Sequence, residues 1–142
     1  MDLIPIVEFL IPSPIVGKGR PRLCRKSGRV FTPKRTRDYE RRAKHLAHKA
    51  MDAESLGPLK GPVGIRLIIA YKTPKSRKKE TGQYCASGPP HYADVDNACK
   101  AVLDSLNRVV YDDDCQVVAL SVSKRFTAEG EAPGVYVQVF EL

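Results

Sequence analysis

The sequence predicts a single α+β domain spanning residues 1–142, in which a mixed β-sheet of about four or five strands packs against two main helices. Three observations lead to this expectation. The chain has 142 residues, which is typical of one domain with a substantial core. Strand-like segments occur near both ends and in the middle of the chain. Two intervening segments place apolar residues at helical spacing.

The N-terminal part of the chain is expected to form a strand and then a hairpin. Residues 3–11 alternate loosely and are rich in Ile, Val and Phe, which favours a strand. Pro12 and Pro14 end it, because proline cannot donate to a ladder of backbone hydrogen bonds. Residues 29–31 form a short β-prone segment, and Ser27-Gly28 before them is a plausible hairpin turn.

A helix of roughly four turns is predicted to follow Thr36, whose hydroxyl suits an N-cap. Asp38 and Glu40 would then lie in the first turn, where the helix dipole favours negative charge. Gly57-Pro58 indicates where this segment ends. The apolar stripe of the helix consists of Tyr39, Ala43, Leu46, Ala47, Ala50 and Met51.

The second half of the chain supplies most of the predicted sheet. Residues 62–72 are apolar on both faces near their centre, so we expect a central strand. Residues 73–93 are basic and rich in Pro and Gly, and a loop of this length is usually functional or disordered. Residues 94–106 have the pattern of a helix, and residues 116–126 and 135–140 alternate as strands.

Composition favours an anionic partner and a protein that stays in the cytoplasm. The net charge is +8 and the isoelectric point about 9.5, which indicates nucleic acid before a membrane surface. No apolar run approaches the roughly 20 residues of a membrane-spanning helix, and the N-terminal apolar run lacks the basic start of a signal peptide. The four cysteines form no C-x-x-C pair, so we expect reduced thiols and no structural zinc.

Charge is strongly segregated along the chain. Residues 17–50 contain thirteen Lys and Arg against two acids, and residues 72–80 contain five against one. A run of like charge is commonly only a solvated face, but a segment this basic repels itself unless an anion binds, and its arginines suit phosphate. The residues that we expect to contact the DNA backbone are Lys18, Arg20, Arg22, Lys34, Arg35, Arg37, Lys75, Arg77, Lys78 and Lys79.

Six of the sixteen acids lie between Asp94 and Asp114, within an otherwise basic chain. Taken separately, Asp94 and Asp96 are explained as helix caps, and residues 112–114 as an acidic turn before a strand. Asp104 is expected to be solvated or loosely paired with Lys100, one turn away. Taken together, carboxylates at a helix start and at a strand start suit a hard divalent cation such as Mg²⁺.

The chain resembles the RusA family of Holliday-junction resolvases, which are crossover junction endodeoxyribonucleases common in prophages. The resemblance covers nearly the whole chain, including Lys18-Gly19-Arg20-Pro21-Arg22 and the segment from Thr32-Pro33 to Tyr39. Its most specific parts are the D-x-D-N-x-x-K motif of residues 94–100, then Leu103 to Asn107, and the D-D-x-Q-V motif of residues 113–117. The extra acid Asp112 is a departure that leaves the register of the second motif open.

The resemblance implies a site and a substrate. Asp94, Asp96 and Asp114 would bind Mg²⁺, or Mn²⁺ in its place, with Asp113 as a further acid, and Lys100 would be needed for cleavage. The substrate would be a four-way DNA junction in a bacterial or phage-infected cell, cut by a homodimer whose two-fold symmetry matches the junction. Two alternatives stay open: a Mg²⁺ nuclease for flaps, forks or other branched DNA, and a non-catalytic DNA-binding protein.

Overall fold

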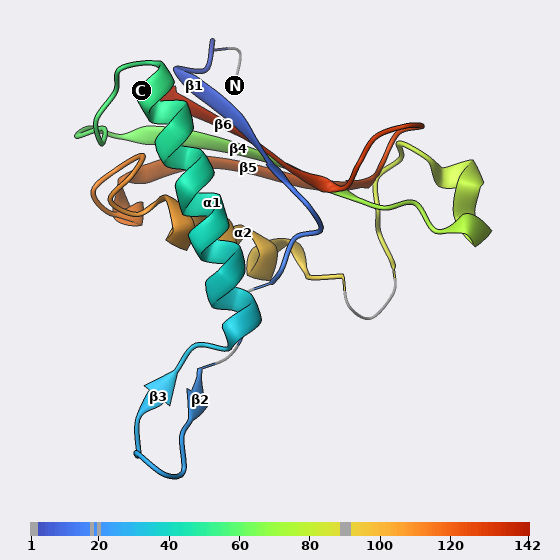
Figure 1. The fold of residues 1–142 in the computed structure, drawn as a ribbon. Coiled ribbons are helices and arrows are strands. Elements are labelled where there is room, and N and C mark those ends of the chain that lie inside the picture. Colours follow the sequence, from blue (N-terminus) through green and yellow to red (C-terminus); the bar gives the residue numbers. More distant parts are fainter. Residues whose placement is uncertain (1–2, 18, 20, 89–91) are drawn as a thin grey trace.

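A computed structural model describes residues 3–17, 19, 21–88 and 92–142 of the chain. It confirms the α+β class and a mixed sheet of four strands in the order β1-β6-β4-β5 (Figure 1). The strands are β1 (Val7–Pro12), β4 (Val63–Tyr71), β5 (Val117–Phe126) and β6 (Gly134–Glu141). The expected central strand is indeed central, because β4 lies between β6 and β5.

Strand pairing leaves β1 and β5 at the two edges of the sheet. β6 pairs antiparallel with both β1 and β4, whereas β4 and β5 pair in parallel. A parallel pair needs a long crossover, and here the crossover contains the loop after β4 and the helix α2 (Val95–Leu106). The crossover therefore brings the start of β5 beside α2.

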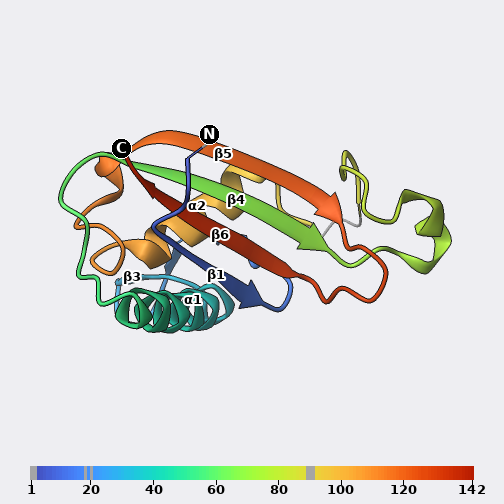
Figure 2. The same cartoon turned by 90° about the horizontal axis from the view of Figure 1, so that it is seen from above.

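Both helices cover the same face of the sheet. α1 (Lys34–Ala53) contacts β1 and α2, and α2 contacts β5. Figure 2 shows α2 behind the sheet and α1 along its β1 side. The core forms between these layers, where alternate residues of β4 such as Ile65, Leu67 and Ile69 are completely buried. No helix in the described ranges has both the length and the apolarity needed to cross a membrane.

The start of α1 differs from the sequence prediction. Pro33 occupies the N-cap position, so the helix begins at Lys34, before Thr36. Thr36 is buried, and its hydroxyl accepts a hydrogen bond from the backbone N–H of Gly19 at 3.1 Å. Proline is tolerated at this position because the first N–H groups of a helix have no partner within it, so the missing N–H costs no helical hydrogen bond. The hydroxyl of Thr36 therefore holds the preceding segment instead of capping α1.

Two smaller elements project from the main sheet. A hairpin of β2 (Arg22–Leu23) and β3 (Val30–Phe31) confirms the predicted hairpin and extends beyond the start of α1 (Figure 1). The long loop after β4 contains a 3₁₀ segment, η1 (Lys75–Glu80), so it has more structure than its composition indicated. Backbone hydrogen bonds from Gly82 to Thr127 and from Cys85 to Lys124 attach this loop to the end of β5.

Candidate active site

A groove between α2 and β5 gathers the charged residues of the two motifs. Asp96, Lys100 and Asp104 line it from α2, and Asp114 lines it from the short 3₁₀ segment η2 (Asp114–Gln116). The opposite wall is apolar and consists of Leu120 and Val122 of β5. The groove thus combines three carboxylates and one ammonium group beside an apolar surface.

The charged residues of helix α2 all lie on one stripe of its surface. Asp96, Lys100 and Asp104 recur every four residues, so their side chains project from consecutive turns of the same face. The opposite face packs into the core through Ala98, Val102 and other buried residues. The amphipathic pattern of the helix therefore fixes the direction in which the charged stripe points.

Asp94 stands at the N-cap of α2 but does not act as a side-chain cap. Its backbone is extended, and its carboxylate accepts no capping hydrogen bond from the first turn of the helix. The residue is exposed and does not line the groove described above. Its carboxylate lies beside the positive end of the helix dipole, which favours negative charge.

Tyr71 holds the chain immediately before Asp94. Its hydroxyl accepts a hydrogen bond from the backbone N–H of Ala93 at 3.0 Å and lies 3.1 Å from the carbonyl oxygen of the same residue, to which it donates. Its ring stacks on Tyr92 with the centroids 4.0 Å apart. Burial raises the pKa of Tyr71 to about 12, so the hydroxyl keeps the proton that it donates.

The three acids of the second motif have different surroundings. Asp112 forms an exposed ion pair with Lys60 at 3.0 Å, and neither residue lines the groove. Asp113 is exposed at the N-cap of η2, and Asp114 is half-buried and lines the groove. The extra acid Asp112 therefore has a partner of its own, and Asp114 is the member of the run that faces α2.

Gln116 fixes the turn that carries these acids. Its side-chain oxygen accepts hydrogen bonds from the backbone N–H groups of Asp112 at 2.8 Å and Asp113 at 3.1 Å. Its side-chain nitrogen donates to the carbonyl oxygens of Leu59 at 2.8 Å and Gly61 at 3.0 Å. One amide thus joins the acidic turn to the segment before β4.

The electrostatics of the groove are those of a site that favours a cation. Burial, followed by the negative charges of Asp113 and Asp104, raises the pKa of Asp114 above its ordinary value, and Lys100 acts in the opposite direction. A cation placed among these carboxylates would offset the part of this rise that comes from Asp113 and Asp104. The carboxylate oxygens are the ligand type that Mg²⁺ prefers, so the donor chemistry fits a hard divalent ion.

The acids do not form a finished coordination sphere. Within the described part of the chain, no group of three or more His, Cys, Asp or Glu side chains is arranged to hold a metal ion. Mg²⁺ usually takes one or two carboxylates and keeps several waters, so a complete protein cage is not a requirement of its binding.

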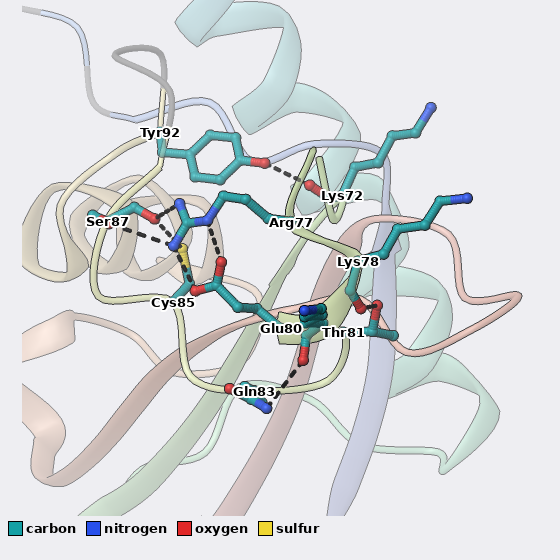
Figure 3. A network of polar contacts seen from close by, with 10 residues as sticks. Lys72, Arg77, Lys78, Glu80, Thr81, Gln83, Cys85, Ser87 and Tyr92 are labelled. Carbon is teal, nitrogen blue, oxygen red and sulfur yellow. Dashed lines mark hydrogen bonds and ion pairs between the residues drawn. The ribbon is translucent and has the colours of Figure 1, made fainter. Parts of the chain in front are cut away.

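The predicted DNA-contacting residues divide into four groups. Arg22, Arg35, Arg37, Lys75, Lys78 and Lys79 are exposed, whereas Lys18 and Arg20 lie outside the described residues. Lys34 is exposed but pairs with Asp38 at 3.0 Å. Arg77 binds Glu80 and the carbonyl oxygen of Ser87 (Figure 3). Its guanidinium also lies over the Phe126 ring. Arg77 therefore organises the loop around it.

Sequence reasoning missed three contributors to this site. We expected Asp104 to be solvated or loosely paired with Lys100, and no role in the site was assigned to it; it is half-buried and lines the groove with Lys100. Its spacing of four residues from Lys100 was the available signal. Gln116 belongs to the D-D-x-Q-V motif, but the sequence assigned no role to it or to Tyr71, because both act through partners distant in sequence.

Comparison with known proteins agrees with this geometry. The family model described as endodeoxyribonuclease RusA matches residues 12–140. An uncharacterised protein of Bacillus subtilis (strain 168), YqaN, is 33% identical over 144 residues, which covers 96% of each chain. The matched region contains both motifs and the groove between them. The chain therefore belongs to the RusA endodeoxyribonuclease family, whose members are nucleases that generally depend on a divalent metal.

Proposed function

We propose that this protein is a Mg²⁺-dependent endonuclease that resolves four-way (Holliday) DNA junctions by paired, symmetric nicks during recombination and repair. The observation that carries the proposal is the groove in which Asp96, Lys100 and Asp114 meet. Membership of an endodeoxyribonuclease family supports the reaction class, and the net charge of +8 supports a DNA substrate.

Each residue of the site has a defined part in this proposal. Asp94, Asp96 and Asp114 would hold Mg²⁺, with Asp113 as a further acid, and Mn²⁺ would substitute because it accepts the same oxygen ligands. The bound ion would activate a water and neutralise charge on the scissile phosphate. Lys100 projects from the turn after Asp96 and would donate a charge-assisted hydrogen bond to an oxygen of that phosphate.

A homodimer completes the proposal. A four-way junction has near two-fold symmetry, and two copies of this chain related by a two-fold axis would present one groove to each of two opposed strands. The dimer would carry a formal charge of +16, twice the +8 of one chain. Sedimentation of the free protein and of its junction complex would measure the stoichiometry, and a complex with one protomer would contradict this part.

The decisive experiment compares two aspartate variants that differ in position but not in chemistry. A labelled synthetic junction is incubated with the wild type, Asp96→Asn and Asp112→Asn, each with Mg²⁺ and with EDTA. Paired, ligatable nicks that need Mg²⁺, vanish in Asp96→Asn and persist in Asp112→Asn would support the proposal. Asp112 is the matched control because its partner is Lys60 outside the groove.

The same assay distinguishes the alternatives. Preferential cutting of flaps or forks, with the junction left intact, would assign another branched substrate to the same site. Tight binding without cleavage under any condition, and without any effect of Asp96→Asn, would identify a non-catalytic DNA-binding protein.

A further inference from the structure

The β2–β3 hairpin exposes apolar side chains that the fold does not cover. Leu23 is 64% exposed, Val30 68% and Phe31 44%. Single exposed apolar residues are normal on a protein surface, but here three of them lie on a hairpin with only two residues in each strand. Such a small element has no core in which to bury them.

The apolar residues occupy both faces of the hairpin. Leu23 is directly opposite Val30, so these two side chains share one face. Phe31 is opposite Arg22 in the adjacent pair, and successive side chains of a strand point to opposite faces. A thin element with apolar side chains on both faces can contact two flat apolar surfaces at once, such as the faces of two neighbouring base pairs.

The positive charge of the hairpin favours an anionic partner such as DNA. Residues 22–31 contain four cations and no acid. Arg22, Arg25, Lys26 and Arg29 are all exposed, so cationic groups surround the apolar side chains. Proteins that kink DNA combine these two features, since apolar wedges enter between base steps while cations hold the neighbouring phosphates.

The hairpin turn is fixed by its own backbone. The N–H of Cys24 donates to the carbonyl oxygen of Arg29 at 2.8 Å, and the N–H of Gly28 donates to that of Cys24 at 2.8 Å. Gly28 has a φ of 67°, a conformation that glycine adopts without strain. These bonds hold the strands together at the tip, as an inserted element requires.

The chain that enters the hairpin is anchored beside the candidate active site. A Cβ atom at Gly17 would lie 2.7 Å from the side-chain nitrogen of Asn97 and 3.0 Å from Ala93, so the backbone passes directly against the start of α2. The backbone N–H of Gly19 then donates a hydrogen bond to the hydroxyl of Thr36 in α1. The chain that leads to the hairpin therefore passes the start of α2, where Asp94 and Asp96 lie, and the hairpin then projects beyond the start of α1 (Figure 1).

We propose that the β2–β3 hairpin is an unstacking wedge, which inserts Leu23, Val30 and Phe31 between base pairs at the branch point of the DNA. This inference rests on the proposed function for its branched substrate. Base pairs at a branch point are the least costly to separate, because they lack part of the stacking that interior pairs have. Insertion there would open the strands next to the groove that contains Asp96 and Lys100.

The test uses a four-way junction with 2-aminopurine beside the branch point, whose fluorescence rises when the base unstacks. Binding in EDTA is compared for the wild type, the triple variant Leu23→Ala/Val30→Ala/Phe31→Ala and the charge variant Arg25→Ala/Lys26→Ala. We expect the wild type to raise the fluorescence, and the triple variant to lose that rise at saturation and to cleave about tenfold more slowly with Mg²⁺. The charge variant should bind more weakly but give the full rise once saturated.

The possible outcomes separate the wedge from the proposed function. Junction cleavage by the wild type without a fluorescence rise overturns the wedge and leaves the resolvase intact. A fluorescence rise without cleavage overturns the resolvase and leaves the wedge as a DNA-binding element. A wild-type dimer that becomes monomeric in the triple variant would overturn the wedge in favour of a contact between two copies. Thermal unfolding of all variants checks that the exposed substitutions preserve the fold.

Discussion

Asp104 is the residue whose role changes most between the sequence and the structure. It lines the groove with Asp96 and Asp114, and its charge contributes to the raised pKa of Asp114. We expect Asp104→Asn to slow junction cleavage by about 10- to 100-fold, the range found when a group that orients metal ligands is altered. Junction affinity in EDTA should change little. Asp112→Asn is the control, and equal rates for the two variants would contradict the assignment.

Gln116 connects stability to the geometry of Asp114. Replacing it with Leu removes four hydrogen bonds and leaves the partly buried carbonyl oxygen of Leu59 without this donor. We expect Gln116→Leu to lower the free energy of unfolding by roughly 1–3 kcal/mol in urea titrations and to slow cleavage as well. Gln83→Ala is the control, because its side chain makes one exposed contact of 3.3 Å. Unchanged stability would show that water replaces the lost bonds.

These two residues also show what can be inferred from a sequence. Helical spacing alone joined Asp96 to Lys100, and the same spacing extends to Asp104. What it could not supply was the second wall of the groove, because Leu120 and Val122 reach α2 only through the parallel pairing of β4 with β5. The partners of Gln116 are likewise remote, with Leu59 separated from it by 57 positions. Local periodicity finds a charged stripe, and tertiary contacts decide what it faces.

At the scale of elements, strand and helix identities followed from periodicity but their order in the sheet did not. Alternation identified β5 and β6, yet it does not indicate that β6 inserts between β1 and β4. The start of α1 was placed too late for a physical reason. Thr36 has a capping side chain, but Gly19 uses its hydroxyl, and Pro33 begins the helix instead.

The segment that connects the hairpin to the rest of the protein gives a prediction at the scale of elements. A methyl group at Gly17 would meet Asn97 and Ala93 at 2.7 and 3.0 Å, so Gly17→Ala should move the entering chain away from α2. We expect a loss of about 1–3 kcal/mol in the free energy of unfolding and slower cleavage. Gly57→Ala is the matched control, since nothing lies within 4 Å of the added methyl. Equal free energies of unfolding and equal cleavage rates for the two variants would mean that the hairpin is not anchored at α2.

At the scale of the whole molecule, an acidic groove lies within a strongly basic chain. The hairpin and α1 carry exposed arginines, whereas the carboxylates of the groove lie on α2 and η2, with Lys100 of α2 among them. Phosphates can therefore bind along the hairpin and α1 while one phosphate reaches the groove with a divalent ion. Separation of charge in space lets one small domain attract a polyanion and still keep a cation site.

This arrangement predicts a steep dependence of DNA binding on salt. Each phosphate neutralised by Lys or Arg releases counterions, so six contacts would lower the affinity about a thousandfold between roughly 50 and 200 mM salt. We expect the slope of log affinity against log salt, measured by fluorescence anisotropy in EDTA, to become shallower by about one for each cation removed, as in Arg35→Ala and Arg37→Ala. Asp96→Asn should leave the slope unchanged, because it removes no cation. A slope near zero for the wild type would contradict phosphate binding by the basic surface, whatever the outcome of the cleavage assay.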